Sequence, residues 1–317
     1  MIMKKDITRF GITIVILAIM LIVVDIAVGF IADRVVDKMP NYSGQMAKDN
    51  YRLHRMDAEI VIIGSSRGSH HYVTSQLSDS IEAYTGKKYT IYNAAIDGKF
   101  ANSNCCAAEM IISRYKPKLV IFDIPESQLR STDVSTDVMF SSPFYWKDTI
   151  VRRYFDNLGL KERLLMKSNL YRYNGKLIRI ASSFLRPKDK DDGYVPLYGT
   201  TIDTSLIKER KKEISGDYCL NTYSESNFAM VLKKYAFNEV PLVIACSPAF
   251  MPTGNNMLLK DMCNKYNTPF IDIYDTPYFN EHPELFKDAG HLNDDGAHVY
   301  TELFFEKLKP YLDCIKK

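Results

Sequence analysis

The sequence places two serines directly after a short apolar run, in a pattern suited to acyl transfer. Residues 58–64 read AEIVIIG, and residues 64–68 read GSSRG. A serine at the turn from a strand into a helix lies at the helix N-terminus, where free N–H groups and the helix dipole favour a developing oxyanion. Ser66 is therefore a candidate nucleophile. The alternative is that Ser65 or Ser66 merely caps the following helix, which is common for serine.

A candidate general base for this serine lies near the C-terminus. Asp288 precedes His291 by three residues, and the helical pattern of residues 298–312 follows. An aspartate at this spacing can accept the Nδ1 proton of the histidine and direct its Nε2 atom toward a serine. A solvated turn is the alternative. His70 and His71 are rival bases, but they share the helix of the serine, which points them away from the required approach.

Two further segments could supply hydrogen-bond donors to an oxyanion. Residues 93–98 (NAAIDG) end in Gly98, whose backbone can approach a reacting centre and present its N–H. A simple turn with a left-handed glycine explains the same pattern. Residues 125–128 (PESQ) directly follow another apolar run.

Five β-rich apolar runs, separated by helix-length segments, are expected to position these residues. They are residues 58–64, 88–94, 116–124, 239–248 and 268–275. Continuous apolar runs of this length indicate parallel strands that are buried on both faces. The sequence therefore predicts an α/β protein with a three-layer, flavodoxin-like α/β/α fold and a five-stranded, mostly parallel sheet. Ligands bind such sheets outside the carboxyl ends of the strands, where the candidate residues fall.

The third and fourth runs are separated by a long insertion, about residues 130–235, rich in Tyr, Lys and Arg. Insertions of this length are usually functional. We expect a mostly helical cap over the edge of the sheet that sets the shape of the substrate site.

Together these segments resemble the SGNH/GDSL hydrolase superfamily, over the chain from its first strand-like run onward, apart from the insertion. In this resemblance GSSR corresponds to the family's GDS motif, with Ser66 at the nucleophile and Ser65 at the aspartate. Gly98 corresponds to the glycine of the second block, and Asp288 and His291 to the terminal dyad. The resemblance implies a serine ester hydrolase or acyltransferase.

The resemblance also implies an oxyanion hole made by the backbone N–H groups of Ser66 and Gly98 and by an asparagine of the third block. This chain departs from the family there, because Ser127 stands at the asparagine position with Gln128 beside it. Either side chain can donate a hydrogen bond. Loss of one such donor typically costs about 2.7–4 kcal/mol of transition-state stabilisation.

Three more polar residues near these motifs are candidates for supporting roles. Asn102 and Asn104, just beyond the glycine of the second block, could replace the missing donor, and Asn102 could contact substrate. Arg67 could contact an anionic group of the substrate, although a solvated surface arginine is the simpler interpretation.

The N-terminal part of the chain predicts a membrane anchor. Residues 10–31 form an apolar run broken only by Asp25, and about 20 apolar residues span a bilayer core. A signal peptide has a shorter apolar region and a small-x-small cleavage site, so retention is favoured. Three basic residues before the run against two after it favour a cytoplasmic N-terminus. We expect Asp25 near the outer interface, or against a partner helix.

The expected organisation has three parts. Residues 1–32 form a cytoplasmic tip and a transmembrane anchor, residues 33–57 a juxtamembrane linker, and residues 58–317 an extracytoplasmic SGNH-like domain. In that domain His291, Leu292 and Asn293 followed by Gly296 are similar to membrane-anchored members of the superfamily.

Composition excludes several other classes of protein. The net charge of +3 comes without a Lys/Arg-rich run, which argues against nucleic acid as a partner. The six cysteines form no CxxC pair and no zinc-ligand spacing, so no metal or organic cofactor is implied. A disulfide between Cys219 and Cys263 is an open alternative.

The function we predict is a serine esterase or O-acyltransferase that acts outside the cytoplasm on O-acylated cell-envelope carbohydrate. It is similar to the single-span SGNH proteins that partner membrane-bound O-acyltransferases. One alternative is a lipolytic esterase, which predicts an exposed apolar pocket lined by the insertion. The other is a non-catalytic envelope scaffold or glycan-binding protein that kept the fold.

Overall fold

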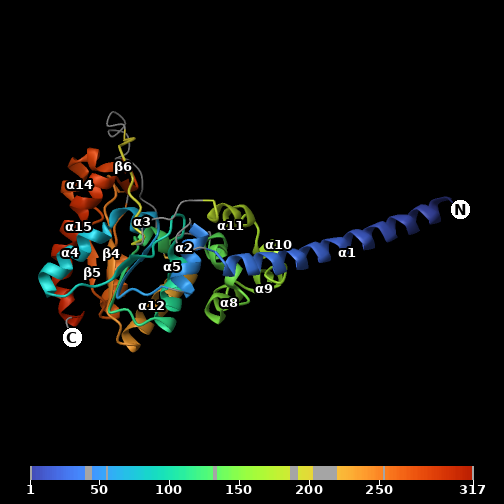
Figure 1. Cartoon of the computed structure of the whole chain (residues 1–317), viewed down its shortest axis with the longest axis horizontal. Helices are drawn as coiled ribbons and strands as arrows, with labels where there is room; N and C mark the ends of the chain where they lie inside the picture. Colours follow the sequence, from blue (N-terminus) through green and yellow to red (C-terminus); the bar gives the residue numbers. More distant parts are fainter. Residues whose placement is uncertain are drawn as a thin grey trace.

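The computed structural model describes residues 2–39, 45–54, 56–130, 134–185, 192–202, 220–252 and 254–315. A five-stranded sheet lies between two layers of helices (Figure 1). Its strands are β1 (Ile60–Gly64), β2 (Ile91–Asn93), β3 (Leu119–Asp123), β4 (Leu242–Cys246) and β5 (Phe270–Asp272). All neighbours pair in parallel, in the order β2-β1-β3-β4-β5. This is the strand order of flavodoxin-like folds, so the predicted α/β fold is confirmed.

Helices precede, connect and follow the strands in the doubly wound part of the chain. Before the insertion they are α2 (Gln45–His54), α3 (Ser66–His71), α4 (Thr74–Thr85), α5 (Ala101–Arg114) and α6 (Glu126–Leu129). At the end of the insertion and after it they are α12 (Thr222–Phe237), α13 (Met257–Lys265), α14 (Pro277–Glu281), η4 (Pro283–Leu285), α15 (Asp294–Leu308) and η5 (Lys309–Ile315). A small antiparallel hairpin, β6 (Phe286–Asp288) and β7 (His291–Leu292), precedes α15.

The central strands are buried on both faces because successive side chains point to opposite sides of the sheet. Val61 and Ile63 of β1 pack in the core that includes α2, α5, α12 and α13. Ile60 and Ile62 pack in the second core, against α4 and α15. All four side chains are fully buried, which explains why the run lacks the alternation of a half-exposed strand.

The N-terminal helix, α1 (Ile2–Asp37), projects from the domain and is exposed along most of its length (Figure 1). Among the described residues, one helix is long and apolar enough to cross a membrane; it covers Asp6–Asp37, and its apolar window has a mean hydropathy of 3.1. A signal sequence meets the same criterion of length and composition. The C-terminal end of α1 is different, because Ala32, Val36 and Met39 are buried in the domain core.

Polar contacts also fix α1 to the domain. The Asp25 carboxylate accepts hydrogen bonds from the Ser168 hydroxyl at 2.6 Å and from the Leu170 N–H at 2.8 Å. Asp33 forms a two-point ion pair with Arg172, with both N···O distances at 2.9 Å. Asp25, expected at the outer interface or against a partner helix, thus binds a helix of its own chain.

Residues 33–57 were expected to form a juxtamembrane linker, but their described part, residues 33–39, 45–54, 56 and 57, is largely helical. They hold the end of α1 and the whole of α2, and Asp49, Arg52 and Leu53 of α2 are buried. The Arg52 guanidinium donates to Asp49 at 3.0 Å and to the Ala94 carbonyl at 2.9 Å. This segment therefore packs on the end of β2 as part of the domain.

The described residues of the insertion fall into three parts, of which α12 is the last. Its helices α7 (Val134–Val138), η1 (Met139–Phe144), α8 (Thr149–Asp156), α9 (Leu160–Leu165), α10 (Asn169–Arg172) and α11 (Leu177–Ser183) follow β3 in the chain. Helices α8–α11 gather around the base of α1 rather than over the sheet edge (Figure 1). The second part, residues 192–202, has no regular secondary structure and lies at the candidate site described below. The expectation of a helical cap over the sheet edge therefore fails for α8–α11.

Candidate active site

Ser66 is the first residue of α3, and only Ser65 separates it from the end of β1. Two glycines allow this tight turn, because close backbone packing leaves no room for a side chain. A Cβ atom on Gly64 would lie 2.9 Å from the Asp123 carbonyl oxygen, and one on Gly68 would lie 2.8 Å from the Ala95 Cβ. The first N–H groups of a helix have no intrahelical acceptor, so α3 presents them beside the Ser66 hydroxyl.

The structure brings Ser66, His291 and Asp288 together across 225 residues of sequence. The His291 Nε2 atom lies 2.7 Å from the Ser66 Oγ atom. On the other side of the ring, Nδ1 lies 2.8 Å from one Asp288 carboxylate oxygen and 3.1 Å from the other. Because a carboxylate only accepts, the proton sits on Nδ1 and leaves Nε2 free to accept the serine proton. All three side chains are partly exposed, so a substrate can reach them.

The loop that carries His291 is fixed by the residues that follow it. Asn293 caps α15 by accepting from the Gly296 N–H at 2.9 Å, and its amide donates to the Glu284 carbonyl at 2.7 Å. A Cβ atom on Gly296 would lie 2.1 Å from the Leu285 carbonyl oxygen, so only glycine fits. The motif noted in the sequence thus holds the hairpin against α15.

His71, a rival base in the sequence, supports this same loop. Its Nε2 atom accepts from the Leu292 N–H at 2.9 Å, so Nδ1 carries the proton and donates to the Ser247 hydroxyl at 3.0 Å. The ring is fully buried. Burial, together with the positive charge of Arg67, lowers the pKa of His71 well below its ordinary value of 6.5. Both ring nitrogens of neutral His71 are thus occupied by Leu292, the residue next to His291, and by Ser247.

This arrangement predicts a stability loss in acid. Because the folded-state pKa of His71 is depressed, the unfolded chain binds a proton below about pH 6.5 that the folded chain does not. Stability is therefore present above that pH and falls by up to about 1.4 kcal/mol per pH unit below it. In thermal unfolding of the full chain between pH 7 and 5, His71→Gln should keep an acceptor for Leu292 and flatten this dependence. An unchanged slope in the variant would contradict the assignment.

His70, the other rival, is also occupied elsewhere. Its Nδ1 atom lies 2.7 Å from the Val195 carbonyl oxygen, and its Nε2 atom lies 3.3 Å from an Asp97 carboxylate oxygen. Burial alone would raise the pKa of Asp97, but the hydrogen bond and charge of His70 outweigh it and lower that pKa. The His70 ring meets the His291 ring edge-on, with centroids 5.8 Å apart, as a neighbour of the candidate triad.

Residues 192–202 connect the two halves of the candidate site. The Val195 N–H donates to the Ser69 carbonyl of α3 at 3.1 Å. Farther along, the Thr201 N–H donates to the Lys287 carbonyl of β6 at 2.8 Å. This part of the insertion thus spans from the serine helix to the histidine hairpin. No periodic pattern in residues 192–202 predicts this path.

Gly98, the residue expected to be the second oxyanion donor, lies in the loop that follows β2. Its φ of +74° lies in the left-handed region, which glycine adopts without strain. The loop before it continues along β1, where the Ile96 N–H donates to the Gly64 carbonyl at 3.1 Å. After it, buried Lys99 pairs with Asp49 of α2 at 2.7 Å. The role of α2 in holding this loop had no signal in the sequence.

The two candidate donors of the third block, Ser127 and Gln128, lie in different environments. Gln128 is buried, and its Nε2 atom lies 2.8 Å from the Ser65 hydroxyl, next to the candidate nucleophile. Ser127 is exposed on the short helix α6. The geometry therefore favours Gln128 over Ser127 as the side-chain donor.

We expect Gln128→Ala to lower kcat for an aryl acetate by about 10²- to 10³-fold, because one oxyanion donor is lost. The KM should change little, since this donor matters most in the transition state. Ser127→Ala is the matched control and should retain nearly full activity. The opposite ranking of the two variants would assign the donor to Ser127.

The remaining candidates lie in structural positions. Arg67 is buried, not solvated, and its guanidinium lies 4.9 Å from the Tyr274 ring centroid. The Asn102 amide donates to Ser224 at 2.9 Å and accepts from Asn227 at 3.0 Å, so it joins α5 to α12. The Asn104 amide donates to the Lys99 carbonyl at 3.2 Å. These hydrogen bonds of the two asparagine side chains are made with residues other than Ser66.

Asp123, at the end of β3, is also buried. It accepts from the Tyr72 hydroxyl at 2.7 Å, and burial raises the pKa of its carboxyl group despite the nearby Arg67 charge. Cys263, one half of the disulfide left open above, has a free and buried thiol, and its partner Cys219 lies outside the described residues. Within the described part of the chain, no cluster of three or more His, Cys, Asp or Glu residues could hold a metal ion.

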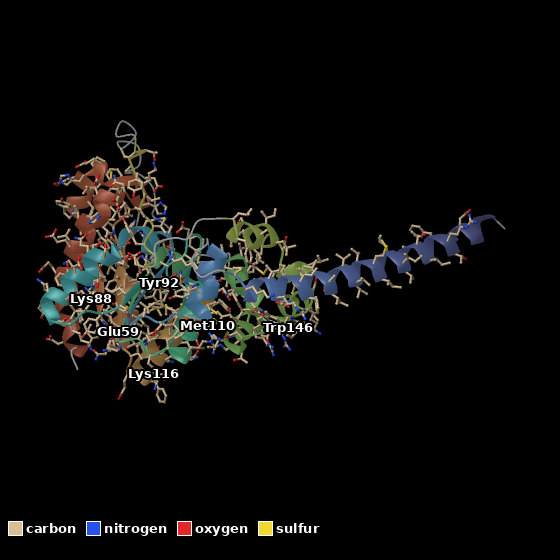
Figure 2. All side chains as sticks on the ribbon, in the orientation of Figure 1. Glu59, Lys88, Tyr92, Met110, Lys116 and Trp146 are labelled. Carbon is tan, nitrogen blue, oxygen red and sulfur yellow. The ribbon has the colours of Figure 1, made fainter. Side chains whose placement is uncertain are left out.

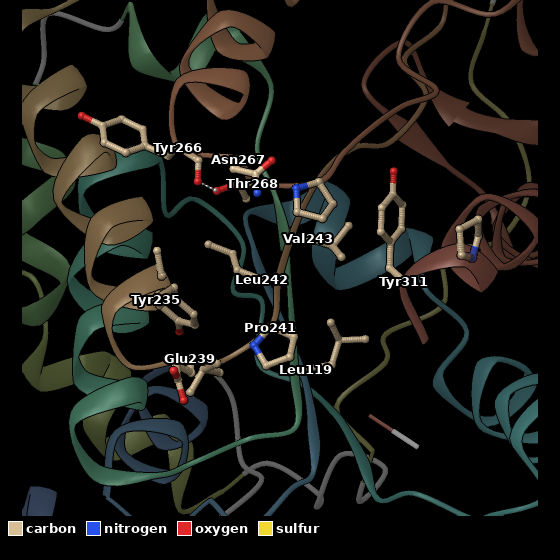
Figure 3. A pocket seen from close by; sticks show the side chains of 14 residues that line it. Leu119, Tyr235, Glu239, Pro241, Leu242, Val243, Tyr266, Asn267, Thr268 and Tyr311 are labelled. Carbon is tan, nitrogen blue, oxygen red and sulfur yellow. Dashed lines mark hydrogen bonds between the residues drawn. The ribbon is translucent and has the colours of Figure 1, made fainter. Parts of the chain in front are cut away.

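A cavity of about 410 Å³ lies away from this chemistry (Figure 3). It is lined by Leu119 and Leu242, the first residues of β3 and β4, and by Tyr235 and Tyr311. Ser66 follows the carboxyl end of β1, so the cavity opens at the opposite end of the parallel sheet. It is not the site of the candidate triad.

Comparisons with known proteins give structural neighbours only. No protein-family profile matches the chain, and no curated protein matches it. Three similar solved structures are a candidate acylhydrolase from Bacteroides fragilis (11% identity, TM-score 0.33), a family two carbohydrate esterase from Clostridium thermocellum in complex with cellohexaose (9%, 0.39) and a gut microbial diltiazem-metabolizing enzyme (10%, 0.38). They cover 79%, 80% and 85% of this chain and 87%, 64% and 48% of their own. At these identities and TM-scores, function rests on the chain's own site.

Proposed function

We propose that the protein is a serine ester hydrolase or acyltransferase with Ser66 as nucleophile. The observation that carries this proposal is the continuous hydrogen-bonded chain from Ser66 Oγ through His291 to Asp288. A helix N-cap explains a serine at this turn, but it does not explain a histidine at 2.7 Å that is oriented by a carboxylate.

In the proposed reaction, His291 Nε2 takes the proton of Ser66 as Oγ attacks the ester carbonyl carbon. The tetrahedral intermediate carries its negative charge toward the N–H groups of Ser66 and Gly98 and the amide of Gln128. Collapse breaks the ester bond, and the imidazolium of His291 returns its proton to the leaving alcohol. Water or a sugar hydroxyl, deprotonated by His291, then attacks the acyl-serine and releases Ser66.

We further propose that α1 is retained as a single-span anchor with a cytoplasmic N-terminus. Cleavage as a signal peptide at the end of the apolar run would remove the Asp25 carboxylate from Ser168 and the Leu170 N–H, which supports retention. The anchor would hold the site next to a membrane, where O-acylated cell-envelope carbohydrate and a membrane-bound O-acyltransferase partner are the substrate and partner that we favour. A lipolytic esterase predicts an exposed apolar substrate pocket that the insertion lines. This alternative is less favoured, because the exposed apolar residues of α9–α11 lie around α1 instead.

The test uses a fluorophosphonate probe on the full chain in detergent micelles. Wild type should be labelled covalently, Ser66→Ala should not, and Ser65→Ala, which removes the adjacent hydroxyl, should still be labelled. Release of acetate from O-acetylated envelope polysaccharide, compared with an aryl acetate, then tests the substrate class. A folded wild-type chain that resists labelling would favour the non-catalytic scaffold.

A further inference from the structure

An apolar surface surrounds the base of α1 on the helices of the insertion. Residues 149–185, which contain α8–α11, form what we call the collar (Figures 1 and 2). Seven of its large apolar side chains are exposed: Leu160, Leu164, Leu170, Leu177, Ile178, Phe184 and Leu185. Ile178 and Leu185 are 83% and 87% exposed. Exposed apolar residues that gather in this way mark an interaction surface.

The collar is also strongly basic. Its sequence holds eight Lys and Arg residues and two Asp and Glu residues, a net charge of +6, whereas the whole chain carries +3. The remainder of the chain is therefore net acidic. Arg172 and Lys176 are buried, so the positive charge on the surface of the collar comes mainly from exposed Lys161, Arg163, Lys167 and Arg179. Basic and apolar side chains on short helices are typical of surfaces that bind anionic lipid.

The length of α1 indicates where the membrane would end. From Phe10 to Val24 the helix rises roughly 22 Å, which is shorter than the roughly 30 Å hydrocarbon core of a bilayer. On the face that does not contact the collar, the apolar surface continues through exposed Ile26, Phe30 and Ile31. The rise from Phe10 to Ile31 is roughly 32 Å, which matches the core.

The collar begins within this same stretch of α1. Asp25 caps the first turn of α10, and a Cβ atom on Gly29 would lie 2.3 Å from the Asn169 side chain. From Asp25 to Ile31 the helix rises roughly 9 Å. A bilayer that covers Ile31 on one face of α1 must therefore reach the collar on the other face, to the depth of 5–10 Å typical of interfacial helices.

We propose that the collar docks into the membrane interface beside α1, on a bilayer that contains anionic phospholipid. This proposal rests on the proposed membrane span of α1. It also accounts for Asp25, because the helix end that it caps supplies N–H and hydroxyl donors to both carboxylate oxygens where water is scarce. The candidate active site would then be held in a fixed orientation to the membrane, not at the end of a flexible tether.

The test measures the membrane depth of collar positions in the full chain. Trp146 is the only tryptophan, so Trp146→Phe gives a background without tryptophan fluorescence. Into it we would introduce Leu164→Trp or Ile178→Trp on the collar, and Ile16→Trp in α1 as the membrane reference. Phe237→Trp is the matched control, since Phe237 is 88% exposed and lies at the end of α12. Each variant is reconstituted in phosphatidylcholine vesicles with phosphatidylglycerol, with and without brominated acyl chains.

Brominated lipid should quench the reference and both collar tryptophans and leave the control unquenched. Quenching of the reference alone would overturn collar docking while the membrane span of α1 stands; a collar covered by an integral membrane partner gives this result. An unquenched reference would overturn the span itself. If the control is quenched as strongly as the collar variants, the domain contacts lipid at positions outside the collar as well. This result would also overturn the proposal.

Discussion

Replacement of His291 by alanine is expected to lower kcat/KM for an aryl acetate by about 10⁴- to 10⁶-fold, as much as Ser66→Ala does. The reason is geometric, because His291 Nε2 is the atom that lies within 2.7 Å of the Ser66 hydroxyl. Without it, the serine remains protonated and is a weak nucleophile. Asp288→Asn should cost about 10⁴-fold, since an amide no longer holds the productive tautomer.

The controls for this prediction are a variant of the neighbouring His70 and a double variant. His70→Asn, which keeps a donor toward Val195, should retain activity within about tenfold. Because Ser66 and His291 act as one unit, the double alanine variant should be no slower than either single variant. A loss in His70→Asn as large as in His291→Ala would assign the base to His70 instead. All rates are measured on the full chain in detergent, with circular dichroism as the check on folding.

The second large effect is expected from removal of α1. A fragment that begins at residue 40 loses Val36 and Met39, which are fully buried and contribute about 2–3 kcal/mol each. It also leaves Arg172, which is 1% exposed, without Asp33, and an uncompensated buried charge typically costs about 3–5 kcal/mol. Domains are stable by only about 5–15 kcal/mol, so this fragment should melt far below the full chain or fail to fold.

A fragment that begins at residue 25 is the matched control, because it keeps every one of these contacts and lacks most of the apolar run. Thermal unfolding in the same detergent should place it close to the full chain. Asp33→Asn in the full chain isolates the polar part and should destabilise by about 3 kcal/mol. Equal unfolding temperatures for the two fragments would show that α1 contributes nothing to the domain, and would restore the interpretation of residues 33–57 as a linker.

The sequence by itself was sufficient for the sheet and for the local geometry around the candidate site. The parallel strands followed from buried runs such as 58–64 and 116–124, because burial on both faces removes polar positions. Ser66 and the Asp288–His291 pair followed from their places at the turns that end such strands. These inferences depend on neighbours in sequence, where residue type and spacing restrict the backbone directly.

Other features depend on contacts between distant segments, and only the tertiary structure decided them. Nothing in the spacing of His71 shows that it binds the Leu292 N–H, or that Gln128 reaches Ser65 while Ser127 faces outward. Each of these contacts depends on which face of the short helices α3 and α6 packs against the rest of the domain. That choice follows from packing and not from local pattern.

The largest difference concerns α1 and the insertion. In the sequence, Asp25 is a charged residue within an apolar run, where its burial in lipid would be unfavourable, and Asp33 is a charged residue just after that run. In the structure Asp25 binds Ser168 and Asp33 binds Arg172, each more than a hundred residues later in the chain. Complementary charges at such separation leave no periodic signal, because chain topology alone brings them together. The sequence therefore determined the sheet and the candidate catalytic residues, and the tertiary structure decided that the C-terminal end of α1 is part of the folded domain.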